Sequence, residues 1–158
     1  MKTITLEAIQ AKQIELDKLI QQFKAQPEST KITYPEVEIE LHPGEHYAGP
    51  VLDESGVVMY HLVMMAACTD NRTTWQASMD WADSVGGALP NCQEASLLFA
   101  NCKPYLEFGW HWTSKIYEGN SSYTWCCHFS DGNQYLLSSN AYGAAVAVRK
   151  VEALKGQP

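Results

Sequence analysis

The chain has 158 residues, 46% of them hydrophobic and 18% charged, which is the composition of a folded globule and excludes wholesale disorder and collagen-like or rod-like proteins. Eighteen acidic residues against eleven basic ones give a formal net charge of −7. Nucleic acids and anionic membranes bind basic patches, so neither is an expected partner. We expect a partner that is neutral or basic.

The charge is unevenly distributed along the chain. Residues 1–31 carry five lysines and four acidic side chains, a net charge of +1, whereas residues 32–158 carry six basic and fourteen acidic side chains, a net charge of −8. We therefore expect two parts, an N-terminal helix with its linker over 1–31 and a domain over 32–158.

The sequence also predicts a compartment. Glu7 stands where a signal peptide needs its apolar run, and no apolar stretch approaches the roughly 18 residues that span a bilayer. The five cysteines are odd in number, and Cys126 and Cys127 point to opposite faces of any strand, which argues against a secreted disulfide framework. We expect a protein of the reducing cytoplasm, in a host cell, or one associated with a virion.

The first predicted element is an amphipathic helix from Thr5 to Lys24. Its apolar residues recur at helical spacing, Thr3 or Thr5 can serve as its N-cap, and Pro27 ends it. Three apolar positions are seven residues apart, too few to establish a coiled coil. The helix is thus open to three interpretations: packing on its own domain, self-association as a homo-oligomer, or docking on a larger assembly.

Strands follow the linker. Apolar and acidic residues alternate over 37–41, which predicts a half-buried strand. Residues 51–52 and 57–65 flank a turn at 53–56 in which Gly56 can adopt positive φ, so they predict a hairpin.

Two helices and further strands complete the domain. The first helix begins after Thr73 or Thr74 and stops at Gly86-Gly87, and the second begins after Asn91 and ends at Pro104. The later predicted strands cover 110–114, 123–129, 134–137 and 144–151. This order indicates an α+β fold with an antiparallel sheet and two flanking helices.

A set of short motifs in residues 45–151 resembles a bacterial and phage domain family. The motifs are Trp81-Ala82, Gly86-Gly87, Leu89-Pro90, Glu94, Trp110-His111-Trp112-Thr113-Ser114, Tyr123-Thr124-Trp125, Phe129-Ser130-Asp131-Gly132 and Ala147-Val148-Arg149. They resemble the domain that ends Lcl-type collagen-like adhesins, which is related to the C-type-lectin-like fold of formylglycine-generating enzymes and of the variable proteins of diversity-generating retroelements.

The resemblance implies a C-type-lectin-like domain. In that fold the last strand, around Val146 to Val148, returns beside an early strand such as 60–64, and two helices flank the sheet. The excursion from Gly109 to Gly143 then carries the ligand surface. The fold serves many binding tasks, so the function has to be argued from the site itself.

Alternation through 123–130 assigns two faces to one strand. Tyr123, Trp125, Cys127 and Phe129 are predicted to face the core. Thr124, Cys126, His128 and Ser130 are predicted to form a polar, exposed face that either contacts a ligand or is an ordinary solvated surface.

The sequence contains few of the residue spacings that are typical of metal sites or of catalytic sites. Consecutive residues such as Cys126-Cys127-His128 cannot converge on one ion, and no zinc-binding spacing occurs elsewhere. Oxygen donors are present at Glu118, Asn120 and Asp131, but not in a calcium-binding run. The sequence therefore predicts no metal, no cofactor and no enzyme. A formylglycine-generating-type oxidase is the rival because the resemblance includes that group, but that group uses a separated cysteine pair, whereas Cys126 and Cys127 are adjacent.

Tyrosine, serine and asparagine are concentrated over 115–142. Tyrosine offers contact area at low rotamer cost and the small polar residues adapt their hydrogen bonds, as in antibody loops, although hairpin turns are rich in Asn and Ser in any case. The predicted ligand-binding residues are Tyr117, Asn120, Ser122, His128, Asn133, Tyr135, Asn140 and Tyr142.

These observations lead to one functional hypothesis. We expect a non-enzymatic recognition module, encoded by a phage or prophage as the resemblance implies, that binds a protein or glycan through residues 115–142. Receptor binding on a virion and antagonism of a host protein remain open, and a structural virion accessory protein is a further alternative.

Overall fold

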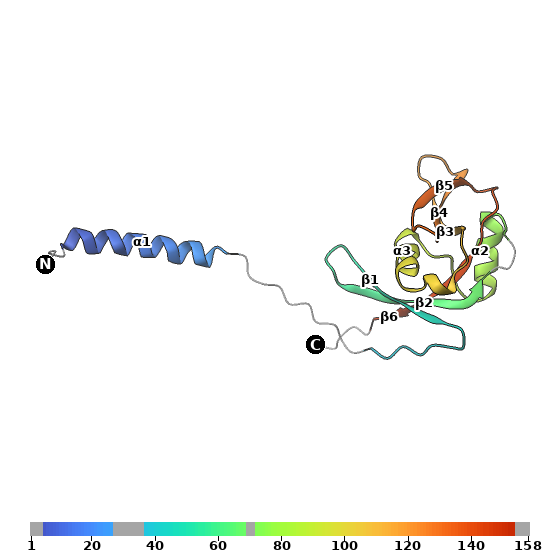
Figure 1. The fold of residues 1–158 in the computed structure, drawn as a ribbon, viewed down its shortest axis with the longest axis horizontal. Coiled ribbons are helices and arrows are strands. Elements are labelled where there is room, and N and C mark those ends of the chain that lie inside the picture. The colour runs from blue at the N-terminus through green and yellow to red at the C-terminus, as the bar shows by residue number, and fades with distance from the viewer. Residues whose placement is uncertain (1–4, 27–36, 69–71, 154–158) are drawn as a thin grey trace. The chain divides into compact units, whose positions relative to one another are not determined.

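A computed structural model describes residues 5–26, 37–68 and 72–153. The chain divides into two compact units, Met1–Tyr34 and Pro35–Pro158. Figure 1 shows their elements. In chain order these are α1 (Leu6–Lys24), β1 (His46–Leu52), β2 (Val58–Cys68), α2 (Trp75–Ser84), α3 (Cys92–Asn101), the short 3-10 helix η1 (Lys103–Tyr105), β3 (Trp110–Ile116), β4 (Tyr123–His128), β5 (Gln134–Ser138) and β6 (Val146–Glu152).

The first unit contains α1, and the predicted helix is confirmed. Thr5 is its N-cap, with the hydroxyl oxygen accepting a hydrogen bond from the Ala8 amide at 3.3 Å. Glu7 in the first turn and Lys24 in the last turn complement the helix dipole. No residue of α1 is buried.

The second unit opens with the predicted hairpin. β1 and β2 pair antiparallel, and the Asp53 carboxylate closes the turn by accepting from the amides of Ser55 and Val57 at 2.9 Å each. Gly56 has φ of 83°, which confirms the positive φ expected there. The first sheet has the strand order β1-β2-β6.

The last strand returns beside an early one, as the resemblance implied. β6 pairs antiparallel with β2, with Val148 opposite Met64. Residues that are 84 positions apart in the sequence are therefore neighbours in one sheet. The chain leaves the first sheet after β2 and returns to it at β6, directly beside β2.

The prediction of a strand over 37–41 is wrong. These residues form no strand and lie in a loop before β1. Arg149 of β6 anchors the loop by donating to the Glu40 carbonyl oxygen and to both carboxylate oxygens of Glu45, all at 2.6 to 2.8 Å. The alternation of Val37 and Ile39 with glutamates reflects a loop with one side against the domain, and no partner strand is adjacent to supply a ladder.

Both helices of the domain begin where the sequence predicted. α2 follows Thr74, whose side chain makes no capping hydrogen bond. α3 follows Asn91, which forms a capping box with Glu94. Pro104 does not directly follow α3: the helix ends at Asn101, and Pro104 lies within η1, where its missing amide is tolerated in the first turn.

A second antiparallel sheet has the order β3-β4-β5, so the fold is α+β with two small sheets where one was expected. In Figure 1 this sheet lies beside α2 and α3. A parallel bridge from His111 of β3 to Ala144 connects it to the chain just before β6. A separate antiparallel bridge from Ala88 to Val148 connects the segment between α2 and α3 to β6.

The core consists of two apolar clusters, and β4 separates them. Cys127 and Phe129 belong to one cluster with residues of α3, β1, β2 and β6. Cys126 belongs to the other, with Trp112 and residues of α2 and β6. The prediction that Cys126 and Cys127 point to opposite faces is confirmed.

The predicted exposure of those faces is wrong. Thr124 and Cys126, assigned to a solvated face, are fully buried, whereas Tyr123 is exposed and Trp125 is half-buried. The physical reason is that β4 is the central strand of its sheet and is covered on both sides along its middle. On β4 the exposed residue, Tyr123, is therefore at the end of the strand, and residues of both faces are buried in its middle.

Candidate functional site

The second sheet carries the predicted ligand-binding residues, but at two separate ends. Asn120 and Ser122 lie in the turn between β3 and β4, and Asn140 lies in the loop after β5. The Ser139 amide and hydroxyl both bond to the Ser122 carbonyl oxygen, at 2.9 and 3.1 Å, and so tie these two segments together. All three predicted side chains at this end are exposed.

The opposite end of the sheet carries an aromatic group formed by Trp110, His128 and Tyr135, one residue from each strand. The ring of Trp110 meets the imidazole of His128 at 4.4 Å between centroids and the ring of Tyr135 at 4.9 Å, both edge to face. Tyr135 remains 43% exposed. We call these three residues the Trp110 group.

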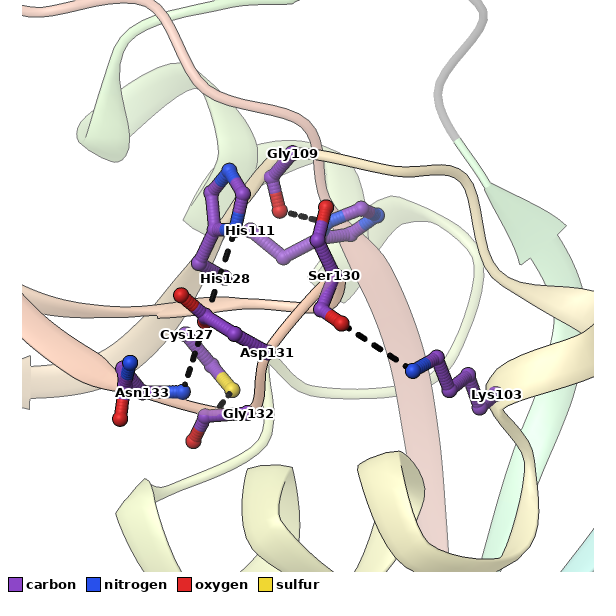
Figure 2. A network of polar contacts seen from close by, with 9 residues as sticks. All are labelled: Lys103, Gly109, His111, Cys127, His128, Ser130, Asp131, Gly132 and Asn133. Carbon is purple, nitrogen blue, oxygen red and sulfur yellow. Dashed lines mark hydrogen bonds and ion pairs between the residues drawn. The ribbon is translucent and has the colours of Figure 1, made fainter.

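The turn between β4 and β5 holds His128 in place (Figure 2). The His128 amide donates to the Asn133 carbonyl oxygen at 2.9 Å, and the Asp131 carboxylate accepts from the Asn133 amide at 3.0 Å. That amide is the largest of the causes that lower the pKa of Asp131. The Asp131 carboxylate lies 3.6 Å from Nδ1 of His128, which gives an ion pair when the imidazole is protonated.

A further contact fixes the same turn from outside the sheet. Lys103, in η1, donates to the Ser130 carbonyl oxygen at 3.1 Å (Figure 2). Gly132 has φ of 77°, and a side chain there would collide with the ring of Phe99 at 2.7 Å. The turn is therefore held both by its own backbone and by the α3 region.

Tyr117 belongs to the other face of the sheet. Its ring meets that of Trp125 edge to face at 6.3 Å between centroids, and it covers Gly119, where an added Cβ would lie 2.7 Å from the tyrosine ring. We call Tyr117 and Trp125 the Tyr117 group. Tyr142, in the loop that leads to β6, is 69% exposed.

β5, the last strand of the sheet, carries Tyr135 of the Trp110 group on one face and, on the other face, Leu136 opposite Trp125 of the Tyr117 group. The hydrogen-bond register of β5 is fixed at both ends, because the His128 amide bonds to Asn133 and the Ser139 amide bonds to Ser122. Hydrogen-bonded pairs alternate with non-bonded pairs along an antiparallel ladder. The register between these two ends follows from the pairing of β4 with β5, which contains no irregularity.

This register decides which backbone groups of β5 are used. Tyr135 and Leu137 exchange hydrogen bonds with β4. Gln134, Leu136 and Ser138 are the alternate positions, so their N–H and C=O groups point away from β4. The Ser138 carbonyl oxygen accepts from the Ala141 amide at 2.8 Å, which leaves the stretch at Gln134 and Leu136 as the open part. Within the described part of the chain no strand pairs with that outer side. β5 therefore presents an open edge.

The other edge strand with a comparable position, β1, is protected. Its pairing with β2 has two irregularities, and it contains Pro50. Side chains of α3 cover its carbonyl oxygens: Asn101 donates to Ala48 at 2.6 Å and Gln93 donates to Leu52 at 3.2 Å. β5 has no proline, no charged residue and no irregularity. Natural sheets usually protect their edges with such features, so an edge without them is a place where another chain can pair.

Sequence reasoning missed Trp110, and it assigned Trp125 to the core. The turn at Asp131-Gly132 located the hairpin but not its register. As the two central residues of a tight turn they would place Ser130 opposite Asn133, whereas the structure places His128 there. The position of Trp110 beside His128 depends on the separate pairing of β3 with β4.

Two carboxylates elsewhere, the buried Glu94 and the half-buried Glu45, have several partners each and serve the fold. Glu94 accepts from the Asn91 amide at 2.7 Å, from the Tyr60 hydroxyl at 2.6 Å and from Lys150 at 3.1 Å. Glu45 is held by Arg149, whose hydrogen bonds lower the pKa of that carboxyl to about 2.

The cysteine pair is poorly suited to thiolate chemistry. Burial raises the pKa of Cys126 to about 12 and that of Cys127 to about 11, so both thiols are protonated near neutral pH. Cys92, Cys102, Cys126 and Cys127 are free thiols. Among the described residues, His, Cys, Asp and Glu side chains form no group of three that could hold a metal ion.

No model of a protein family matches the chain, and no curated protein is significantly similar to it. In the described segments, none of the helices has both the length and the apolar character needed to cross a membrane.

Proposed function

We propose that this protein is a non-enzymatic recognition module that binds an extended segment of a partner protein along β5. The observation that carries the proposal is the open edge at Gln134 and Leu136, on a strand whose two faces carry Tyr135 of the Trp110 group and Leu136, which lies opposite Trp125. Main-chain hydrogen bonds supply affinity in strand addition, and side chains on alternate faces supply specificity.

The side chains beside the edge suit such a partner. Tyr135 contributes exposed aromatic surface on one face, and Leu136 contributes half-buried apolar surface on the other. Residues on an added strand would alternate between these two faces. Large, rigid aromatic side chains surrounded by adaptable polar residues commonly dominate protein interfaces.

Charge restricts the partner further. Residues 32–158 carry a net charge of −8, whereas β5 itself carries no charge. Two copies pairing through β5 would bring two acidic domains into contact, and like charges disfavour that. A neutral or basic segment of a different protein is therefore the favoured occupant.

The C-type-lectin-like fold is part of the same proposal. The pairing of β6 with β2 and the excursion that carries β3, β4 and β5 support it. In this proposal the excursion is the variable, ligand-binding part of the domain, presented by the first sheet and its helices. A role as a phage or prophage protein, acting on a host protein or at a host receptor, rests on the resemblance alone.

A backbone variant tests the site. Leu136→Pro removes one outward N–H and leaves the hydrogen bonds with β4 in place, because residue 136 makes none of them. Leu136→Val is the matched control, since it keeps the N–H and an apolar side chain. A displayed library of random peptides is selected on the wild-type protein, and enriched peptides are then measured against both variants.

We expect the proline variant to lose about tenfold or more in affinity and the valine variant to stay close to wild type. Amide exchange at Gln134 and Leu136 should slow when a selected peptide binds the wild-type protein, which is a measurement independent of whether the proline variant folds. Peptides that bind the folded proline variant equally well, or a target that proves to be a glycan, would refute the proposal.

A further inference from the structure

The helix α1 has an apolar face with the spacing of a coiled coil. Between Leu6 and Phe23, steps of three and four residues alternate and place six side chains on one stripe. Counted as heptads, position a holds Leu6, Gln13 and Ile20, and position d holds Ile9, Leu16 and Phe23. Every apolar member of this stripe is exposed.

Shallow hollows lie along the same stripe. One is lined by Ile9, Lys12, Gln13 and Leu16 together with Ala8, and a second includes Leu19, Ile20 and Phe23. The first four residues occupy positions d, g, a and d. Four residues in this arrangement form the hole that receives one side chain of a facing helix in a coiled coil.

The charges of α1 select the partner. The helix carries three acidic residues and three lysines, so its net charge is zero and copies of it do not repel one another. In two parallel helices in register, position g of one lies beside position e of the next heptad of the other. Here that pairs Lys12 with Asp17 of a second copy. In an antiparallel pair, position g faces position g, so this contact is lost.

We infer that α1 associates in parallel with α1 of other copies of this chain. A helix of 19 residues with no buried residue is marginal by itself, and burial of the stripe between copies stabilises it. The polar Gln13 at an a position fixes the register. Parallel association places every attached domain at the same end of the bundle, and, resting on the proposed function, this multiplies binding to a target that offers several sites.

Sedimentation equilibrium of the full chain over a range of concentrations tests the association. We expect the mass to rise to a whole-number multiple of the monomer. Leu16→Asp, on the stripe, should give a monomer, whereas Ile14→Asp should not. Ile14 is the matched control because it is also apolar and is 70% exposed, yet lies off the stripe.

Charge-reversal variants and a cysteine variant test the parallel arrangement. Lys12→Glu or Asp17→Lys alone should weaken association, and the double variant should restore it. Phe23→Cys should form a disulfide between copies, because parallel helices hold the two residues side by side and in-register antiparallel helices separate them by about 26 Å. The wild-type chain is the control for its native cysteines, none of which lies in α1.

A wild-type chain that stays monomeric at every concentration would overturn the inference, as would equal effects of Leu16→Asp and Ile14→Asp. Absence of the disulfide or of the charge rescue in an oligomeric chain would overturn the parallel arrangement. Selected peptides should bind monomeric Leu16→Asp as single ligands with unchanged affinity, so failure of the self-association and failure of the β5 site are separate results.

Discussion

The indole of Trp112 shows how one residue joins distant segments. It is fully buried in the cluster with Cys126, and its Nε1 donates to the Thr73 carbonyl oxygen at 2.8 Å. Gly143 packs against the same ring, where an added Cβ would lie 2.9 Å from Nε1. The ring therefore links β3 to the start of α2 and to the approach to β6.

We predict that Trp112→Ala lowers the free energy of unfolding by about 3 to 5 kcal/mol, because it leaves a large cavity and removes one of the two hydrogen bonds that the Thr73 carbonyl oxygen accepts, the other coming from the Gly143 amide. Trp112→Phe keeps most of the volume but not the donor, and should cost less. Urea denaturation measures both. Trp125→Ala should cost less than Trp112→Ala, because Trp125 is only half-buried; equal costs would contradict the assignment of the two rings.

His111 makes the stability depend on pH. Its imidazole is almost completely buried, its Nδ1 donates to the Gly109 carbonyl oxygen at 3.3 Å, and burial lowers its pKa from 6.5 to about 4. Between these two values the unfolded chain binds a proton that the folded chain does not bind. The contribution of His111 to stability is therefore complete above about pH 6.5 and is lost as the pH falls towards 4.

We predict a corresponding difference between pH 7 and pH 5. Over that interval the wild type should lose about 2 kcal/mol more of its unfolding free energy than His111→Gln does. Comparing the two proteins cancels the contributions of the other titratable groups that both share. Parallel pH profiles for the two proteins would show that His111 is protonated in the fold.

Alternation along a single strand predicts direction but not burial. It placed Cys126 and Cys127 on opposite faces correctly, because direction is a local property of extended backbone. It failed for Thr124 and Tyr123, because burial depends on which elements cover the strand. α2, α3 and the start of β6 cover the middle of β4, and these elements lie far from it in the sequence.

At the scale of elements, local chemistry fixed most boundaries. Thr5, Asn91 and Gly56 act where they were predicted to act, since caps and turns depend on neighbouring backbone. The segment 37–41 has the same alternation as a strand, yet it has no ladder partner. Its place is set by one long-range contact, Arg149, that the local pattern does not contain.

This anchor gives a prediction about the loop before β1. Arg149→Met should free the segment over 37–45, speed its amide exchange and its proteolysis, and lower the unfolding free energy by about 2 kcal/mol, because Glu45 loses its charged partner. Arg149→Lys is the control that keeps the charge but not the paired donors. Unchanged proteolysis of the loop in the methionine variant would show that other contacts hold it.

For the whole molecule, the order of elements predicted the α+β class, and the resemblance predicted the return of β6 to β2. The sequence did not predict the division of the strands between two sheets, because pairing partners of separate hairpins are not encoded locally. The candidate residues consequently formed one group in the sequence, whereas the structure places them at opposite ends of the second sheet. The open edge of β5 between these ends depends on strand pairing, which composition does not contain.

The division of the chain into two compact units leads to a prediction about truncation. Removing residues 1–26 should leave the melting temperature of the remaining domain unchanged within a few degrees, because no residue of α1 is buried. Calorimetry on the full and shortened chains at one low concentration measures this. A large fall in melting temperature would place α1 in the core of the domain.

The position of β4 between the two apolar clusters has a consequence for how the core opens. Its adjacent residues Cys126 and Cys127 belong to different clusters, so neither cluster can lose β4 while the other keeps it intact. The two halves of the core should therefore open together, as a single cooperative unit with one free energy of opening. Slowly exchanging amides in β2 and in β4 should then report the same global event, although the strands belong to different sheets.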